Sequence, residues 1–116
     1  MWEIRTTDTF DEWLDALDDT DRENVIAAMI VLRQKGPLLS RPYADTVKGS
    51  AHKNMKELRV QSKGNPIRAF FAFDPNRAAI LLCAGEKTGK EKRFYEEMIP
   101  VADREFSDHL DTLHER

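Results

Sequence analysis

The charged side chains with the clearest chemical potential lie near the middle of the chain, on stretches of alternating sequence. Glu57 and Arg59 are two residues apart on a predicted strand, so both side chains project from one face of the sheet. Arg68 lies in an otherwise apolar strand, where a charge is costly unless it reaches solvent or a partner. Such a set can place a proton-accepting carboxylate beside guanidinium groups that hold a phosphate. The same residues also suit a simple cross-strand ion pair on a solvent face, with Arg68 paired to Glu57 or half exposed.

Basic residues are concentrated in the same region, although the chain has a net charge of −3 and a pI of about 5.6. Residues 48–93 contain eleven lysines and arginines but only four acidic residues, and each flank has a net charge of −5. A local basic surface can bind a polyanion that the whole-molecule pI conceals. We therefore expect function in the middle of the chain, and we interpret the acidic flanks mainly as solvent faces of helices.

Length and composition predict a single domain over residues 1–116, because 41% apolar and 34% charged residues are typical of a globular chain. The longest apolar run, residues 25–32, is shorter than the roughly 20 residues that cross a bilayer, and residues 1–15 lack a signal-peptide pattern. We therefore expect a cytoplasmic protein without membrane contact. Cys83 is the only cysteine, which excludes an intramolecular disulfide and a thiolate metal cage and favours a buried apolar role.

The amino-terminal part of the chain is typical of a short strand followed by two helices. Trp2–Thr6 alternates large and polar residues. Two helical patterns follow, and each starts with a threonine that has a glutamate three residues later, at Thr9 and Thr20, in the form of a capping box. The second pattern ends at Gly36, and we expect the two helices to form an antiparallel hairpin. Residues 37–54 are expected to form an irregular exposed loop.

Three strands and a last helix are predicted after this loop. Met55–Val60, Ile67–Asp74 and Ala78–Gly85 have a period of two, and their short connections require antiparallel pairing. The carboxyl-terminal segment has helical spacing, and Pro100 predicts a break or a kink in it. The predicted fold class is therefore α+β: a strand, a two-helix hairpin, three antiparallel strands and a C-terminal helix broken near Pro100.

Three segments and the order of these elements carry a family resemblance. The segments are Met55–Val60, Ile67–Phe73 and Cys83–Thr88, and Ile99–Asp103 adds a weaker likeness at the carboxyl end. The chain resembles the RelE/HigB-like toxins of type II toxin-antitoxin modules, most closely the phage-derived HigB-type branch of the RelE/ParE superfamily. The resemblance implies a RelE-like fold over nearly the whole chain.

The resemblance also implies an activity and partners. Such toxins are endoribonucleases that cut mRNA on translating ribosomes and so inhibit translation, without a metal or a cofactor. Each is neutralised by a cognate antitoxin, often a helix-turn-helix protein, through which the toxin contacts operator DNA indirectly. Attack by the RNA 2′-hydroxyl needs a base for the nucleophile, cations for the phosphate and an acid for the leaving oxygen.

By resemblance, three residues take specific roles. Arg68 matches a transition-state-stabilising arginine, Glu57 falls where relatives carry a lysine or glutamate base, and Lys87 falls where a cation steadies the scissile phosphate. With Arg59 they form the predicted reaction centre. Further cations are expected to follow an RNA backbone, although a solvated face is the commoner explanation of a short charge run. They are Lys48, His52, Lys53, Lys56, Lys63, Lys90, Lys92 and Arg93.

The general acid is not identified by the sequence. Tyr95 and His52 are the candidates, but Tyr95 shares a helical face with Met98, so packing is its expected role. His109 and His114 lie on the predicted terminal helix and are expected to pack or to face solvent.

Two other functions therefore stay open. The incomplete acid and base set favours a non-catalytic RNA- or protein-binding module of the same fold. A ParE-like gyrase inhibitor shares the fold too, and the set Glu57, Arg59, Arg68 and Lys87 argues against it.

Overall fold

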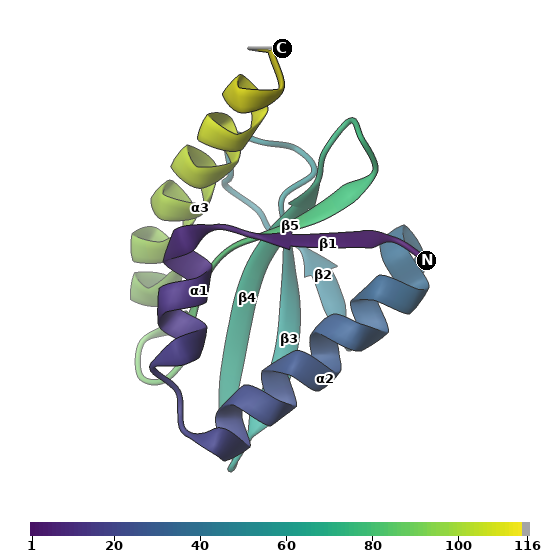
Figure 1. The fold of residues 1–116 in the computed structure, drawn as a ribbon. Helices are drawn as coiled ribbons and strands as arrows, with labels where there is room; N and C mark the ends of the chain where they lie inside the picture. Colours follow the sequence, from purple (N-terminus) through teal and green to yellow (C-terminus); the bar gives the residue numbers. More distant parts are fainter. Residues whose placement is uncertain (115–116) are drawn as a thin grey trace.

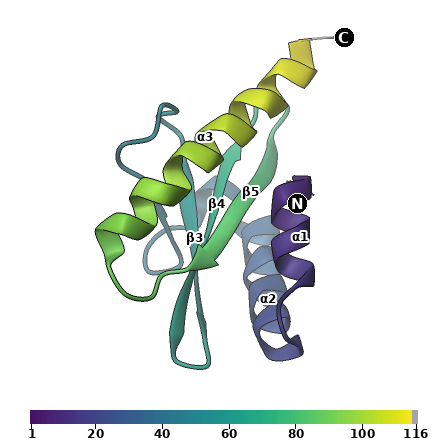
Figure 2. The same ribbon diagram turned by 90° about the vertical axis from the view of Figure 1, so that its left-hand side faces the viewer.

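The computed structural model describes residues 1–114 and contains one five-stranded sheet with helices on both faces (Figure 1). The strands lie in the order β1, β5, β4, β3, β2. Helices α1 and α2 cover one face, and α3 crosses the other (Figure 2). The strands are β1 (Glu3–Thr6), β2 (Ala44–Thr46), β3 (Lys56–Ser62), β4 (Asn65–Phe73) and β5 (Ala78–Glu86), and the helices are α1 (Asp8–Asp15), α2 (Asp19–Lys35), the 3₁₀ turn η1 (Gly36–Leu38) and α3 (Glu91–His114). The predicted α+β class and the order of its main elements are confirmed.

Two antiparallel hairpins form the centre of the sheet. β3 pairs with β4 through a tight turn at Lys63 and Gly64, whose φ angles are 51° and 80°. Two positive φ values define the turn that best matches the twist of a hairpin, and glycine adopts them without strain. β4 then pairs with β5, with a register shift between Phe70 and Phe71. Residues of β3, β4 and β5 can therefore share one surface.

The edge strands were not fully predicted. β1 pairs in parallel with β5, with Glu3 opposite Ala78. At the other edge, β2 lies inside the segment expected to be an irregular loop, with Ala44 opposite Leu58. A strand of three residues is too short for an alternating pattern to be recognised in the sequence.

Side chains of the central strands alternate between two hydrophobic clusters. Phe71 of β4 packs toward α1 and α2, where Phe10 and Leu32 are also buried. Phe70 points to the other face and packs with Phe106 of α3. A strand covered on both faces has a nearly continuous apolar sequence, which explains the run in β4.

The N-caps of helices α1 and α2 both lie two residues before the predicted caps. Thr7, and not Thr9, caps α1, because its Oγ1 accepts a hydrogen bond from the Phe10 N–H at 3.1 Å. Asp18, and not Thr20, caps α2, because its Oδ1 accepts from the Asp21 N–H at 2.9 Å. Several residue types cap helices well, so a second candidate nearby shifts a predicted boundary.

Helix α3 continues through Pro100, so the predicted break is wrong. A proline inside a helix removes one hydrogen bond and crowds the preceding turn, which costs about 3 kcal/mol. Packing on both sides of Pro100 offsets this cost, since Met98 and Ile99 before it and Ala102 after it belong to the cluster beneath α3. Neither α3 nor any other helix within residues 1–114 is long and apolar enough to cross a bilayer.

Candidate functional site

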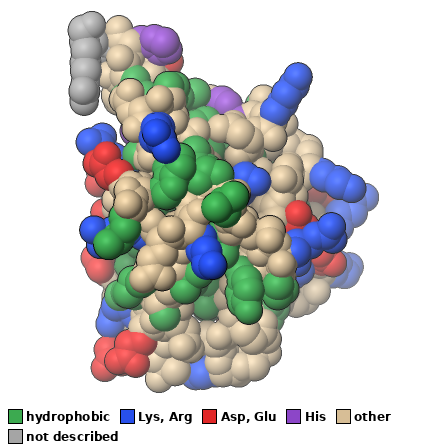
Figure 3. Space-filling model, turned by 90° about the vertical axis from the view of Figure 1, so that its right-hand side faces the viewer, with side chains coloured by type: hydrophobic (Ala, Val, Ile, Leu, Met, Phe, Trp, Pro, Cys, Tyr) green, Lys and Arg blue, Asp and Glu red, His purple; other side chains and the backbone are tan. Residues whose placement is uncertain are grey.

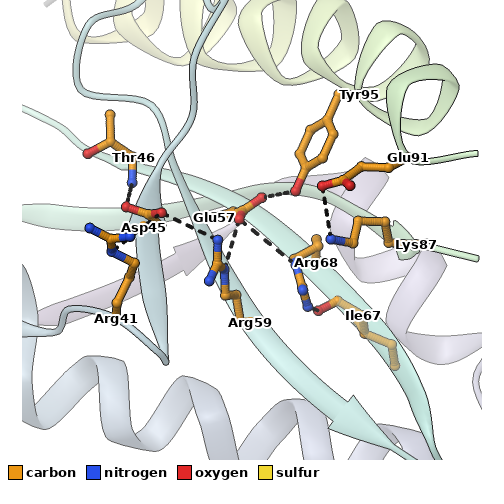
Figure 4. Close-up of polar contacts among 10 residues, drawn as sticks. All are labelled: Arg41, Asp45, Thr46, Glu57, Arg59, Ile67, Arg68, Lys87, Glu91 and Tyr95. Atoms are coloured by element: carbon orange, nitrogen blue, oxygen red, sulfur yellow. Dashed lines mark hydrogen bonds and ion pairs between the residues drawn. The ribbon is translucent and has the colours of Figure 1, made fainter.

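Three charged residues of β3 and β4, Glu57, Arg59 and Arg68, meet on the sheet face that α3 covers (Figure 4). Arg59 and Arg68 are directly opposite each other in the β3–β4 register. Glu57 lies two residues before Arg59 and therefore on the same face. The hairpin thus brings together three charged groups that are separated along the chain.

Three side chains surround the carboxylate of Glu57, a residue that is only 3% exposed. Arg59 Nε donates to Oε2 at 3.0 Å, and the Tyr95 hydroxyl donates to Oε1 at 2.6 Å (Figure 4). Arg68 Nε lies 3.9 Å from Oε2. A buried carboxylate is tolerated when its charge is paired and its oxygens accept hydrogen bonds, and Glu57 meets both conditions.

Arg68 retains unused hydrogen-bonding capacity beside Glu57. Its side chain is 12% exposed, and its Nη1 donates to the Ile67 carbonyl at 3.1 Å. Its buried Nε has no hydrogen-bond partner among the described residues. An unpaired donor on a buried cation is costly, and a guanidinium accommodates oxyanions well. The arrangement favours an anionic ligand next to Arg68.

Tyr95 of α3 completes the cluster, although the sequence indicated a packing role. Its ring does pack edge to face on Phe70, with centroids 6.0 Å apart, while its hydroxyl bonds Glu57. Burial and the Glu57 carboxylate raise the pKa of Tyr95 to about 12, so the phenol keeps its proton at neutral pH. The contact with Glu57 spans 38 residues and depends on how α3 crosses the sheet. The sequence carries no local signal for it.

Lys87 lies just beyond β5, and its backbone N–H donates to the Pro66 carbonyl at 2.7 Å. Its Nζ is 3.3 Å from Glu91 and 5.9 Å from the centre of the Tyr95 ring. Figure 4 shows it beside Tyr95 and Arg68. The four residues of the predicted reaction centre therefore lie in one region.

A cleft of about 330 Å³ leads to Glu57, Arg59 and Tyr95. On its β2 side, Asp45 accepts a hydrogen bond from Arg59 Nη2 at 3.3 Å, a contact that the sequence analysis missed. Arg59 thus bridges two carboxylates, and its hydrogen bond with Glu57 raises the pKa of the guanidinium. Lys48 lines the same cleft and adds a further cation.

The cluster contains the groups needed to cleave a phosphodiester by attack of a neighbouring hydroxyl. Glu57 can accept a proton, Tyr95 can donate one, and the guanidinium groups of Arg59 and Arg68 can stabilise negative charge on phosphorus-bound oxygens. Because the Glu57 and Tyr95 oxygens are 2.6 Å apart, a proton can pass directly between base and acid.

The loop between β2 and β3 is fastened to α3. Asp103 accepts hydrogen bonds from the Ser50 hydroxyl and, at 2.9 Å, from the Ala51 N–H. His52 Nε2 lies 3.0 Å from Ser107 Oγ. These contacts hold the loop against α3. The loop carries three of the predicted RNA-binding residues, Lys48, His52 and Lys53.

The other predicted RNA-binding residues are divided between the two faces. Lys63, in the hairpin turn, pairs with Asp18 and Asp21 at the start of α2. Lys56 shares its face of β3 with Leu58, which packs toward α2. Both therefore lie on the sheet face opposite Glu57. The exposed cations on the Glu57 side, at the start of α3, are Lys90, Lys92 and Arg93.

Comparison with known proteins identifies the family to which this chain belongs. Residues 12–107 match the family described as phage derived protein Gp49-like. Two relatives come from Mycobacterium tuberculosis. "Putative toxin HigB2" is 52% identical over 99 residues, 84% of this chain and 49% of that protein, and "Putative toxin HigB3" is 43% identical over 104 residues, 90% of each. The chain belongs to the Gp49-like family, which confirms the RelE/HigB-like resemblance. It spans about half the length of HigB2.

Two solved structures share the fold. A mutant of the E. coli toxin RelE in the free state gives a TM-score of 0.59 at 11% identity, over 78% of this chain and 87% of that one. The toxin-antitoxin complex RelBE from E. coli gives 0.57 at 8% identity, over 73% of this chain and 95% of the matched one. At these identities the likeness concerns the fold alone.

Proposed function

We propose that this protein is the toxin of a toxin-antitoxin system and acts as a metal-independent endoribonuclease that cuts mRNA on translating ribosomes. The observation that carries the proposal is the convergence of Arg59, Arg68 and Tyr95 on the buried carboxylate of Glu57 at an open cleft. The family and the names of its relatives support the toxin role.

In the proposed reaction, Glu57 takes the proton of an RNA 2′-hydroxyl, and the 2′-oxygen attacks the adjacent phosphorus. The bond from phosphorus to the 5′-oxygen breaks, and the Tyr95 hydroxyl protonates the departing oxygen. Arg59, Arg68 and Lys87 stabilise the charge on the phosphoryl oxygens. Glu57 then returns its proton to Tyr95 across their hydrogen bond, which restores both groups for the next cycle.

Substrate also changes the state of the base in this scheme. Without RNA, Arg59 and Arg68 are directed at Glu57. A phosphate that draws these guanidinium groups toward itself loosens their contacts with the carboxylate and leaves its oxygens available to accept the 2′-hydroxyl proton. The ion pairs thus keep the reactive groups in place until the phosphate arrives.

The same proposal includes the partners. A cognate helix-turn-helix antitoxin neutralises the protein in the cytoplasm and links it indirectly to operator DNA, while mRNA and the ribosome supply the substrate. One specific observation favours a second function, that of a non-catalytic RNA binder: Glu57 is almost completely buried and its oxygens are already engaged. The two functions differ in whether new RNA ends appear.

The test is expression without the antitoxin, with growth and mRNA 5′ ends recorded. The wild type is expected to arrest growth and to produce new, ribosome-dependent ends, and Arg68→Ala to reduce cleavage by about 10²- to 10³-fold because one transition-state contact is lost. Arg104→Ala, which removes an exposed cation of α3, is the matched control and should stay toxic. If Arg68→Ala is as toxic as the wild type, the assigned site is wrong. If growth stops without new ends, the protein binds but does not cut.

A further inference from the structure

Helix α2 exposes aliphatic side chains to solvent as well as burying them. Val25 and Leu32 are fully buried, yet Ile26, Ile30 and Val31 are 40%, 52% and 38% exposed. Single exposed aliphatic residues are ordinary on protein surfaces, but contiguous patches mark sites of interaction. The segment after the helix adds Leu38 and Tyr43, 84% and 61% exposed.

A hollow of about 430 Å³ lies between α2 and the segment that leads into β2, and Val31 and Tyr43 are the exposed apolar residues that line it. We call it the α2 groove. Figure 3 shows hydrophobic side chains gathered on the side of the molecule toward which the C-terminal end of α2 points, with acidic side chains away from the centre of the view. The walls of the α2 groove include Ala28, Val31, Lys35, Leu39, Tyr43 and Arg59.

The charged residues that line the α2 groove within the described part of the chain are both cations, Lys35 and Arg59. Arg41 follows nearby, although it pairs with Asp45 at 3.9 Å. An apolar groove lined by cations is complementary to a segment with apolar anchors flanked by carboxylates.

We propose that the α2 groove binds an acidic amphipathic helix of the antitoxin, an inference that rests on the proposed toxin function. A helix suits the site better than a strand. Strand addition needs a row of free backbone groups, but β2 has only three residues, Pro42 lacks an N–H, and the Tyr43 carbonyl already accepts from the Arg59 N–H at 2.8 Å. A helix instead places apolar residues at steps of three and four against Val31 and Tyr43.

The position of the α2 groove links binding to neutralisation. Arg59 lines both the α2 groove and the cleft that leads to Glu57. The Arg59 guanidinium itself is on the cleft side, where it bonds Glu57 and Asp45, so the α2 groove reaches the strand position of Arg59 from the opposite face of the sheet. An antitoxin whose helix binds in the α2 groove can therefore extend a flanking segment around the edge of the sheet to cover the cleft.

The test uses the protein encoded by the adjacent reading frame as the binding probe. Val31→Glu puts a negative charge into the α2 groove, where it repels the carboxylates of the bound helix. Lys35→Glu reverses an exposed positive charge at the border of the groove without changing the core. Thr20→Glu is the control, because it adds the same charge at the exposed amino-terminal end of the same helix. Binding is measured on purified proteins, together with growth in cells that express each variant with and without the partner.

Val31→Glu is expected to raise the Kd of the complex with the partner protein about tenfold or more. Lys35→Glu should raise the Kd several-fold, and this effect should become smaller at high salt. Thr20→Glu should stay within about twofold of the wild-type Kd. All three should arrest growth when expressed alone, and Val31→Glu should escape neutralisation. If Val31→Glu fails to fold, the affinity of Lys35→Glu for the partner tests the inference.

Other results overturn the inference in distinguishable ways. Unchanged affinity in both groove variants shows that the antitoxin binds elsewhere. A wild-type dimer that Val31→Glu converts to monomer assigns the groove to a second copy of the chain, and loss of RNA affinity with intact partner binding assigns it to RNA. A wild type that neither binds the partner nor arrests growth removes the proposed function as well.

Discussion

Glu57 is the residue on which the candidate site depends, because it receives two guanidinium groups and one phenol from three different elements. Arg59 and Tyr95 donate hydrogen bonds to the buried carboxylate and Arg68 offsets its charge, and the carboxylate in turn holds these side chains in position. Each charged group of the site therefore depends on the others, and a single substitution there will affect the stability of the protein as well as its chemistry. Variants that keep the shape of a side chain are the informative ones.

Tyr95→Phe keeps the ring packed on Phe70 and removes only the hydroxyl. We expect the rate of RNA cleavage to fall about 10²- to 10⁴-fold with little change in RNA affinity, because the leaving oxygen loses its proton donor. The free energy of unfolding should fall by about 1 kcal/mol for the lost hydrogen bond. Single-turnover cleavage and urea unfolding measure the two effects. Tyr43→Phe, at an exposed tyrosine, should change neither. An unchanged rate in Tyr95→Phe excludes the phenol as the acid.

The sequence alone could predict part of this site. Alternation along a strand places Glu57 and Arg59 on one face, and a charge in an apolar run draws attention to Arg68. Tyr95 and Asp45 could not be assigned, because their contacts depend on the path of α3 over the sheet and on the unpredicted strand β2. Periodicity describes one element at a time, and these contacts lie between elements.

At the scale of elements, the far half of α3 is attached to the sheet by a buried polar pair. His109 Nε2 lies 2.8 Å from Asp74 Oδ2, and the Asp74 side chain is 1% exposed. Burial works to raise the pKa of Asp74, but the contact with His109 and the hydrogen bonds from the Ala78 and Asn76 N–H groups outweigh it and hold the pKa below its usual value of 3.8. Ionised Asp74 is therefore a stabilising link between α3 and the turn before β5.

The sign of the pH effect follows from the lowered pKa. The contribution of Asp74 is fully present above pH 3.8 and is lost as the pH falls through the lower pKa of the folded protein. Asp74→Asn should cost about 1 to 3 kcal/mol at neutral pH and flatten the loss of stability in acid. Urea unfolding across pH 2 to 7 measures this, with the exposed Asp108→Asn as control. Parallel stability curves for Asp74→Asn and the wild type would refute the role of this pair.

Elements were predictable where one physical pattern dominates over many residues. The apolar spacing of α2 and the alternation of β4 are of this kind. Pro100 misled the prediction because local propensity opposes a helix there while packing against the sheet, a tertiary effect, favours it. The parallel pairing of β1 is tertiary as well, since its partner β5 is about 75 residues away.

At the scale of the whole molecule, the basic region is divided by the sheet. Lys48 lines the cleft, and the exposed cations of the α3 start lie on the same face. Two of these, Lys92 and Arg93, pair with Glu96 and Glu97 of the same helix. Lys63 pairs with Asp18 and Asp21 on the other face and cannot add to the field at the cleft. The net basic charge of residues 48–93 therefore overstates the surface available to RNA.

This division predicts a difference in salt dependence. For single-stranded RNA, each phosphate contact contributes about −0.7 to the slope of log K against log salt concentration. Lys48→Ala should reduce the magnitude of the slope by about this amount, and Lys63→Ala should leave it unchanged. Filter binding with the slowly cleaving Tyr95→Phe protein measures both. Equal changes in the two lysine variants would show that RNA also contacts the α2 face.

The attachment of the β2–β3 loop to α3 through Asp103 has a mechanical consequence. The helix supplies Tyr95 and the loop supplies Lys48, so the proposed proton donor and a cation that lines the cleft belong to one connected wall, while Glu57, Arg59 and Arg68 belong to the sheet. A change in the position of α3 would therefore move Tyr95 and Lys48 together. In the proposed mechanism such a change would separate the acid from the base and leave the charged groups of the sheet in place.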